Sequence, residues 1–522
     1  MKNSIDLYSG IGGWTMGMKL SNINNVASYE WWKEANQTHN FNFGTNHKEI
    51  DIRKININDL KFDQNIDFVV GSPPCTQFSY ANRGGNGDIN DGLIDIAKFL
   101  EIVAYLKPKY WAMENVPRVA KILEKELAPD GSLHKFQSLV KTLQVVDSAE
   151  YGVPQNRKRM IAGNFPIELF ESYKKNIKQV TFGEVLEALK KETIVDPNYG
   201  YSLPRNKITE LKHEANLTPQ EERINRDSKT FHPVYNKMSF PDKLDRPSRT
   251  VTATCTRVSR ESIIVKSKNG FRRLCVREKG VIQGFPITYQ FYGKTLNSKF
   301  KMVGNAVPPI LTYYIFQSML EVPADKIKSP KESTYYHSVP PFKGYESKLG
   351  LPKRKFPAKR KFKYAVPSLR YGSGVRFELS NSPKSETIPW SFKFFYGNSK
   401  NIKEIPLNRE IKNSLAPIVN TTKNEVFNEC LNKLEKKYSS LNSTKLQEIW
   451  TSSQLNNDVF DFLDEVGNCV DEILEKSDFS HIDSKLVSHI VQEDNKKLNK
   501  NSQSILTGFY FLSSLNKKLF NQ

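Results

Sequence analysis

The sequence predicts an α/β fold over the first part of the chain, with a doubly wound, mostly parallel sheet that carries helices on its faces. Short apolar runs alternate there with helical patterns, and Leu93, Ile96 and Leu100 keep the three- and four-residue spacing of a helix. Strands that alternate with helices favour parallel pairing, because a parallel pair needs a crossover connection. The predicted strands are SIDLY, VASYE, DFVVG, KYWAME and KRMIAGN, which begin at residues 4, 26, 67, 109 and 158.

Changes of texture divide the 522-residue chain into five predicted parts, residues 1–165, 166–245, 246–322, 323–363 and 364–522. The first part carries the strand and helix alternation. The second is polar and irregular after a short helix, and order returns in the third. The fourth is a basic linker, with nine basic residues and one acid between residues 343 and 363. The fifth is an extension predicted to be α+β, with β-like aromatic runs first and helical patterns later.

The composition favours a polyanionic partner. Lys and Arg number 77 against 56 acidic residues, a formal net charge of +21, and nucleic acid is the commonest polyanion. A merely soluble basic protein is the alternative. The five cysteines form no CxxC pair, which disfavours structural zinc and a disulfide framework. No apolar run reaches the roughly 18 residues of a membrane span, so we expect a soluble, cytoplasmic protein.

A glycine-rich turn, DLYSGIGG, follows the first predicted strand at residues 6–13. Glycines at a strand-to-helix turn let a cofactor approach the backbone closely. Glu30 ends the second strand, where an acid can accept hydrogen bonds from ribose hydroxyls, and the next residue, Trp31, offers an adenine-sized face. The turn lacks the full GxGxxG spacing of a pyrophosphate loop. A nucleoside cofactor, a dinucleotide and a plain tight turn all remain open from these residues alone.

A single cysteine follows two prolines in GSPPC, just past the third strand. A lone cysteine is usually a small buried hydrophobe. Here the prolines restrict the backbone before Cys75, at the sheet edge where ligands bind in open parallel sheets, so a catalytic nucleophile is the better interpretation. Glu114 ends the fourth strand at the same edge and offers a proton donor or acceptor. Arg157 and Arg159 open the next strand, and arginines near a thiol favour the thiolate.

Taken together, these motifs resemble one family, the DNA cytosine-5 methyltransferases. DLYSGIGG is similar to its S-adenosylmethionine motif and GSPPCTQFS to its nucleophile motif. ENV, QNRKR and GNAVPP follow in the family's order, and RPSRTVTAT and RRLCVREKGVIQGFP are similar to the segments before the last of them. The resemblance covers residues 1 to about 320 and implies a Rossmann-like, class I methyltransferase fold.

The resemblance also implies a mechanism. The Cys75 thiolate would add to C6 of a flipped-out cytosine, which makes C5 electron-rich. Glu114 would contact N3 and the exocyclic amine, and Arg157 would support the base and the thiolate with Arg159 nearby. The methyl group would come from S-adenosylmethionine, and no step needs a metal. The residues implied for the cofactor are Tyr8, Gly10, Gly12, Gly13, Glu30, Trp31, Asp51, Ile52, Pro74, Leu93, Asn305, Ala306 and Val307.

Two further segments take roles from the resemblance. Residues 76–92, polar and rich in glycine, would be the loop that closes over the flipped base. The irregular stretch at residues 193–245 would read the target sequence. Its candidate readers of bases or phosphates are Arg205, Arg223, Arg226, Lys229 and Lys237.

The expected partner is duplex DNA, in a restriction–modification system whose cognate endonuclease acts on the same site without stable binding, and we expect a monomer. An RNA (tRNA) cytosine-5 methyltransferase and a catalytically inactive DNA binder are the alternatives for the main function. Three interpretations compete for the extension: an added DNA-binding module, a fused nuclease, and a protein-interaction domain. The apolar face of NDVFDFLDEVGNCVDEILEK fits the third, although such a face is more often ordinary core.

Overall fold

The computed structural model divides into two compact units, and each unit is made of two separate segments of the chain. The first unit is Met1–Asn216 with Phe240–Gly350, and the second is Leu217–Ser239 with Leu351–Gln522. The structure describes residues 1–78, 87–230, 238–341, 344, 346–349, 357–371, 374–383, 389–397, 402–407, 413, 424–438, 442–452, 458–476 and 500–520.

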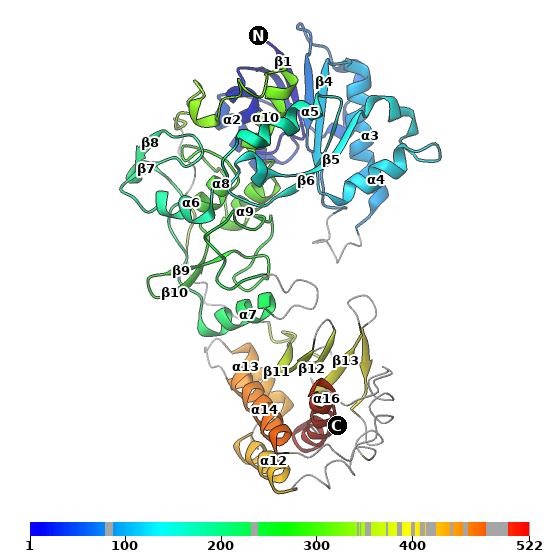
Figure 1. Cartoon of the computed structure of the whole chain (residues 1–522), viewed down its shortest axis with the longest axis vertical. Coiled ribbons are helices and arrows are strands. Elements are labelled where there is room, and N and C mark those ends of the chain that lie inside the picture. The colour runs from blue at the N-terminus through cyan, green and yellow to red at the C-terminus, as the bar shows by residue number, and fades with distance from the viewer. Residues whose placement is uncertain are drawn as a thin grey trace. The chain divides into compact units, whose positions relative to one another are not determined.

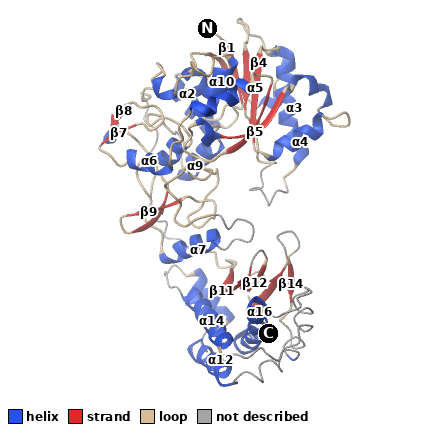
Figure 2. Ribbon diagram, viewed as in Figure 1, coloured by secondary structure: helices blue, strands red, loops and turns tan. Residues whose placement is uncertain are grey.

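A six-stranded mixed sheet with the order β2-β1-β3-β4-β6-β5 forms the centre of the first unit (Figures 1 and 2). Its strands are β1 (Asn3–Leu7), β2 (Asn24–Tyr29), β3 (Phe68–Gly71), β4 (Tyr110–Asn115), β5 (Thr142–Asp147) and β6 (Lys158–Gly163). The β1–β2, β1–β3 and β3–β4 pairs are parallel. Only β6 runs against its neighbours β4 and β5 among these strands.

Alternate side chains of the strands enter two hydrophobic cores, one on each face of the sheet. Ile5 and Val69 pack with helices α3 (Ile89–Leu106) and α4 (Arg118–Leu127). Phe68 and Val70 pack with α1 (Gly13–Leu20) and α10 (Pro309–Met319), on the other face. The period of two along each strand therefore produces the three-layer arrangement and confirms the predicted α/β class.

Two features of the sheet differ from the sequence expectation. The strand TLQVVD, which forms the edge strand β5, was not among the predicted strands, because its middle residues Gln144 and Val145 are exposed and its apolar pattern is weak. The direction of β6 was also not readable from its residues. It follows β5 after the short segment 148–157, too short for the crossover that a parallel pair requires, so antiparallel pairing results.

The rest of the first unit brings the chain back to the start of the sheet. Helix α2 (Lys33–Phe43) lies between β2 and β3, and α5 (Ile167–Ser172), α6 (Phe182–Ala188) and the hairpins β7–β8 (Thr193–Val195, Ser202–Pro204) and β9–β10 (Ile264–Ser267, Gly270–Arg273) follow β6. Helices α8 (Val276–Ile282), α9 (Leu296–Asn305) and α10 complete it. The Thr312 hydroxyl of α10 donates to the Gly13 carbonyl at 2.9 Å, which fixes the end of the unit against its first turn.

The second unit is a four-stranded antiparallel sheet with the order β11-β12-β13-β14, packed against helices. Its strands are β11 (Lys363–Tyr371), β12 (Val375–Asn381), β13 (Trp390–Tyr396) and β14 (Lys403–Ile405). Its helices are α7 (Pro219–Thr230), α12 (Asn424–Tyr438), α13 (Ser443–Thr451), α14 (Asp458–Glu475) and α16 (Lys500–Leu515). This α+β architecture matches the predicted extension. The apolar face of α14 lies in its hydrophobic core, so the core interpretation of that face holds. None of the helices in the described part of the chain is both long enough and apolar enough for a membrane span.

The division into units does not follow the predicted boundary at residue 245. Residues 217–239, expected with the irregular region of the first unit, belong to the second. Helix α7, PQEERINRDSKT, has almost no apolar residues, so nothing in its own pattern indicated which core it joins. Ile224 packs against the core of the second unit, and the Arg223 guanidinium donates to Asp464 of α14 at 2.7 and 2.6 Å.

Candidate active site

A cavity of about 330 Å³ opens at the carboxyl ends of β1, β3 and β4. This is the edge at which open α/β sheets bind ligands. The turns that follow these three strands line it, together with residues 301–307 of α9 and the segment after it. The sequence-predicted residues that it brings together are Tyr8, Gly10, Glu30, Trp31, Pro74, Cys75, Glu114, Arg157, Arg159, Asn305, Ala306 and Val307.

The turn that carries Cys75 is held on both sides. The Trp14 indole donates to the Ser72 hydroxyl at 3.0 Å, and the Asn115 amide donates to the Pro73 carbonyl at 3.0 Å. After the cysteine, the Phe78 ring is fully buried and lies against Gly92 of α3, where a Cβ would collide with it. The two prolines limit the backbone between these anchors, so the half-buried thiol has a fixed position in the cavity.

The electrostatics around Cys75 are mixed. Burial raises the pKa of the thiol, Arg159 opposes this rise, Glu114 adds to it, and Arg157 opposes it. The free thiol is therefore the resting form at neutral pH, because desolvation outweighs the two guanidinium groups.

The two arginines both line the cavity but take different positions in it. Arg159 makes an ion pair with Glu114, with Nε 2.8 Å from Oε1. Arg157 instead donates to the carbonyls of Val251, Gly304 and Ala306 at 3.1, 2.9 and 3.0 Å. Three of its donors therefore hold the walls of the cavity together. Arg159 lies on β6, whereas Arg157 precedes that strand and contacts the end of α9, a contact that the motif alone could not reveal.

The cofactor end of the cavity is formed by the first turn and β2. Gly10 has φ 54°, in the left-handed region, and a Cβ there would meet no atom within 4 Å, so this part of the turn is open. The Glu30 carboxylate accepts from the amides of Gly10 and Trp32 at 2.8 and 2.7 Å. Each oxygen keeps a lone pair for a hydroxyl donor. The neighbouring residue Trp31 is 63% exposed, so its apolar ring faces solvent.

Five residues predicted for the cofactor do not line the cavity: Gly12, Gly13, Asp51, Ile52 and Leu93. The two glycines are required for packing, since a Cβ on Gly12 would collide with Phe43 of α2 and one on Gly13 with the Val307 carbonyl. Ile52 and Leu93 are almost fully buried behind the cavity wall. The Asp51 carboxylate accepts from the Arg53 amide at 3.1 Å.

Several lining residues were missed by sequence reasoning, among them Trp14, Trp32, Lys301 and Met302. The two tryptophans lie next to recognised motifs, and this proximity could have indicated that they line the cavity. The signal for Lys301 and Met302 was weaker. They precede GNAVPP on a helix, and tertiary packing decides which side of that helix lines the cavity. The Lys301 ammonium lies over the Trp32 ring, 4.9 Å from its centroid, so these two form one wall.

The predicted target-reading cations are mostly engaged. The Arg205 guanidinium donates to the Leu189 carbonyl, and Arg223 is paired with Asp464. Lys229 is fully buried and donates to Asn225 at 3.1 Å. These three therefore hold structure. Arg226 is half exposed and pairs with Glu222 on its own helix. Lys237, and residues 79–86 of the predicted closing loop, lie outside the described residues.

One cluster has potential metal ligands, His213, Cys275 and Glu278, whose ligand atoms lie within 4.8 Å of one another. Arg272 already donates to both Glu278 oxygens at 2.9 and 2.8 Å. The Glu278 amide and carboxylate also form a capping box with Cys275 at the start of α8. These contacts account for the cluster without an ion.

Comparison with known proteins places this geometry in context. A family model described as C-5 cytosine-specific DNA methylase matches residues 2–321. Type II methyltransferase M.FnuDI of Fusobacterium nucleatum is 26% identical over 348 residues, 63% of this chain and 97% of that protein. Type II methyltransferase M.DdeI of Desulfomicrobium norvegicum is 26% identical over 367 residues, 59% of this chain and 86% of that protein. The structure of S. pombe Dnmt2 methyltransferase has a TM-score of 0.44 and 16% identity, covering 62% of this chain and 99% of that one.

Proposed function

Because the chain belongs to the C-5 cytosine-specific DNA methylase family, we propose that Cys75, Glu114 and Arg159 carry its methyl transfer to cytosine C5. The chain is thus a DNA (cytosine-5-)-methyltransferase, and the family implies S-adenosylmethionine as the methyl donor. The observation that supports these roles is the shared cavity, which places a thiol, an ion-paired carboxylate and an open, glycine-lined turn together.

The residues of the cofactor end fit a nucleoside with a positively charged sulfonium tail. Trp31 offers a face for a purine ring, and Glu30 retains acceptors for ribose hydroxyls. Gly10 leaves room beside the backbone for the amino-acid part. When bound, S-adenosylmethionine supplies the methyl group as an electrophile. Asp51, Ile52 and Leu93 would act by holding these groups in place.

The reaction of the base depends on the groups at the other end. The Cys75 sulfur bonds to cytosine C6 as the C5–C6 π electrons move toward N3 and C5, and the thiol proton passes to N3 by way of Glu114 or water. We propose that Glu114 accepts a hydrogen bond from the exocyclic amine and shares with N3 a proton that either the acid or the base carries, while Arg159 fixes the Glu114 side chain. After C5 has gained the methyl group, a base, which we assign to water, removes the C5 proton. The C6–sulfur bond then breaks and Cys75 leaves as thiolate. We propose no metal for any of these steps.

The biological setting follows the same proposal. Type II methyltransferases are the relatives of this chain, so we assign it to a restriction–modification system that protects a specific duplex sequence. The target cytosine must leave the stack to reach Cys75, at a cost of roughly a few kcal/mol. We propose a cytoplasmic monomer, with a cognate endonuclease that acts on the same site without binding this chain stably.

The test is tritium transfer from labelled S-adenosylmethionine to genomic duplex DNA from many sources, with total tRNA in parallel. Label in DNA at cytosine C5, absent with Cys75→Ala, is the expected result. Label in tRNA alone would replace the substrate with RNA and leave the chemistry unchanged. Retained transfer by Cys75→Ala would refute the nucleophile assignment. No label from DNA of any source would favour a catalytically inactive binder.

A further inference from the structure

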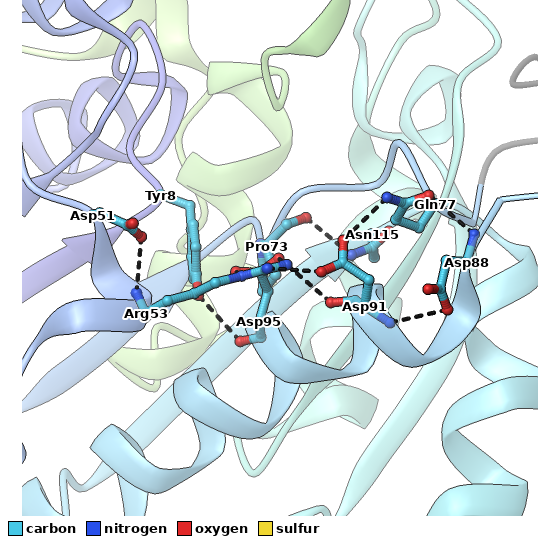
Figure 3. Close-up of polar contacts among 9 residues, drawn as sticks. All are labelled: Tyr8, Asp51, Arg53, Pro73, Gln77, Asp88, Asp91, Asp95 and Asn115. Carbon is cyan, nitrogen blue, oxygen red and sulfur yellow. Dashed lines mark hydrogen bonds and ion pairs between the residues drawn. The ribbon is translucent and has the colours of Figure 1, made fainter.

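A charged network runs behind the cavity and joins its two ends (Figure 3). At its centre is Arg53, in a single 3-10 turn of residues Ile52–Lys54. Its guanidinium donates to both oxygens of Asp95 at 2.9 and 2.7 Å. It also donates to the carboxylate and the carbonyl of Asp91 at 2.7 and 2.9 Å. Both acids belong to the first turns of α3, so one side chain fixes this helix end to the segment after β2.

One end of the network reaches the cofactor turn. The Tyr8 hydroxyl donates to the Asp95 carbonyl and carboxylate at 3.2 and 3.3 Å. Tyr8 has φ 56°, an uncommon value for a residue with a side chain, and it lines the cavity. The hydroxyl contact therefore holds a turn whose backbone would otherwise relax. Arg53 fixes the Asp95 carboxylate that Tyr8 also contacts, and because Asp95 is 5% exposed, little water competes for that carboxylate.

The other end reaches the nucleophile turn. The Gln77 amide nitrogen donates to Asp91 at 3.0 Å, and its amide oxygen accepts from the Asp88 amide at 3.0 Å. Gly87 lies so close to the Gln77 carbonyl that any Cβ would collide with it. Gln77 is two residues after Cys75, so the position of Asp91 is transmitted directly to the turn that holds the thiol.

Arg53 has no contact with the reacting groups. The side chains that line the cavity do not include Arg53, Asp91 or Gln77. An ordinary exposed ion pair contributes little to stability. This one differs in geometry, because a planar fork engages two carboxylates at once and one of them is almost buried. Removal of the fork would leave Asp95 and Asp91 free to move apart.

We propose that Arg53 is a positioning residue that links cofactor binding to the placement of Cys75. It acts through Asp95 and Tyr8 on the cofactor turn and through Asp91 and Gln77 on the nucleophile turn. This inference rests on the proposed function, since it assumes that S-adenosylmethionine binds at the Tyr8 end. A nucleophile that is placed correctly only when the cofactor turn is ordered would make the two binding events cooperative.

The experiment measures the two ends separately in the full chain. Calorimetry gives the Kd for S-adenosylhomocysteine, and iodoacetamide gives the alkylation rate of Cys75, with mass spectrometry to separate it from the four buried cysteines. The variants are Arg53→Gln, Arg53→Lys and Gln77→Leu. Lys54→Gln is the matched control, because it removes a neighbouring cation whose side chain is 83% exposed and which pairs only weakly with Asp51.

The expected result is a change at both ends from one substitution. Arg53→Gln weakens S-adenosylhomocysteine binding roughly 5- to 50-fold and changes the Cys75 alkylation rate at least about fivefold. Gln77→Leu changes only the alkylation rate, and has little further effect in the Arg53→Gln background. Arg53→Lys should bring only one of the two readouts part of the way back from the Arg53→Gln value toward wild type, because an ammonium cannot bridge both acids. Lys54→Gln stays within about twofold of wild type.

Three outcomes would overturn the inference. In the first, both readouts of Arg53→Gln match wild type. In the second, Tm falls while both readouts stay at wild-type values, which would make Arg53 a stabilising residue only. In the third, the Arg53→Gln and Gln77→Leu effects on alkylation multiply independently. Wild-type protein that neither binds S-adenosylhomocysteine nor transfers label would instead refute the proposed function, which the wild-type assay shows on its own.

Discussion

The Nε atom of Arg159 lies 2.8 Å from Oε1 of Glu114, and the two side chains are only 12% and 7% exposed. A pair this well shielded from solvent is screened little by salt. The carboxylate that we propose contacts the base is therefore held by a charge in the same cavity as Cys75. Arg157 belongs to the same motif as Arg159, but its guanidinium donates hydrogen bonds to backbone carbonyls instead.

Replacement of the two arginines should separate these roles. Arg159→Met is expected to fold normally and to lose roughly 10²- to 10⁴-fold in the methylation rate, the range of a misplaced acid–base group. Arg157→Met should lower Tm, because three buried carbonyls lose their donor. Single-turnover rates and thermal melts of both variants test this. Equal losses of rate and equal Tm values in the two variants would show that the arginines act together.

The pH dependence of Cys75 follows from its burial. Because burial raises the pKa of this thiol, alkylation by iodoacetamide should keep rising beyond the ordinary thiol pKa of about 8.5. Arg159 opposes that rise, so Arg159→Met should move the profile to still higher pH. The measurement is the rate at each pH relative to a free thiol such as N-acetylcysteine. A profile that levels off at or below the free thiol would contradict the expectation.

Asp6 should make stability depend on pH. It is fully buried under the first turn, accepts from the Thr15 hydroxyl at 2.8 Å, and burial raises its pKa to about 8. A raised pKa in the folded state means that stability is lost as pH rises, here between about pH 4 and 8. Asp6→Asn carries no such proton, so its Tm relative to wild type should increase across that window. Asp59→Asn, at an exposed position, controls for the loss of one charge. A constant difference between Asp6→Asn and wild type at all pH values would refute the assignment.

Removal of residues 351–522, the rest of the second unit, should expose α7. This polar helix of 12 residues would lose Asp464 and the core against which Ile224 packs. An isolated helix of this length is marginal in water. Trypsin should therefore cut after Arg223 and Lys229 much faster in the truncated chain than in the full one. In the full chain, the Arg223→Gln variant should be cut after Lys229 at an intermediate rate. Mass spectrometry of timed digests reads this out. Equal cleavage in both chains would show that α7 is stable without the extension.

Short sequence motifs predicted many of the residues that line the cavity. The α/β class could be predicted, and so could the presence of Cys75, Glu114, Gly10 and Glu30 in one cavity, because each of these residues lies at the end of a strand or just after it. Their roles stay predictions. Strand and helix patterns work for the same reason, since burial on one face repeats within a single element.

Only the tertiary structure decided the rest. It showed that Arg159 and not Arg157 pairs with Glu114, that Gly12 and Gly13 serve packing, and that α7 joins the second unit. It also showed that Arg53 holds acids 38 and 42 residues away in sequence. Such contacts depend on how separate elements pack and on which buried charge finds a partner, and no local pattern records that choice.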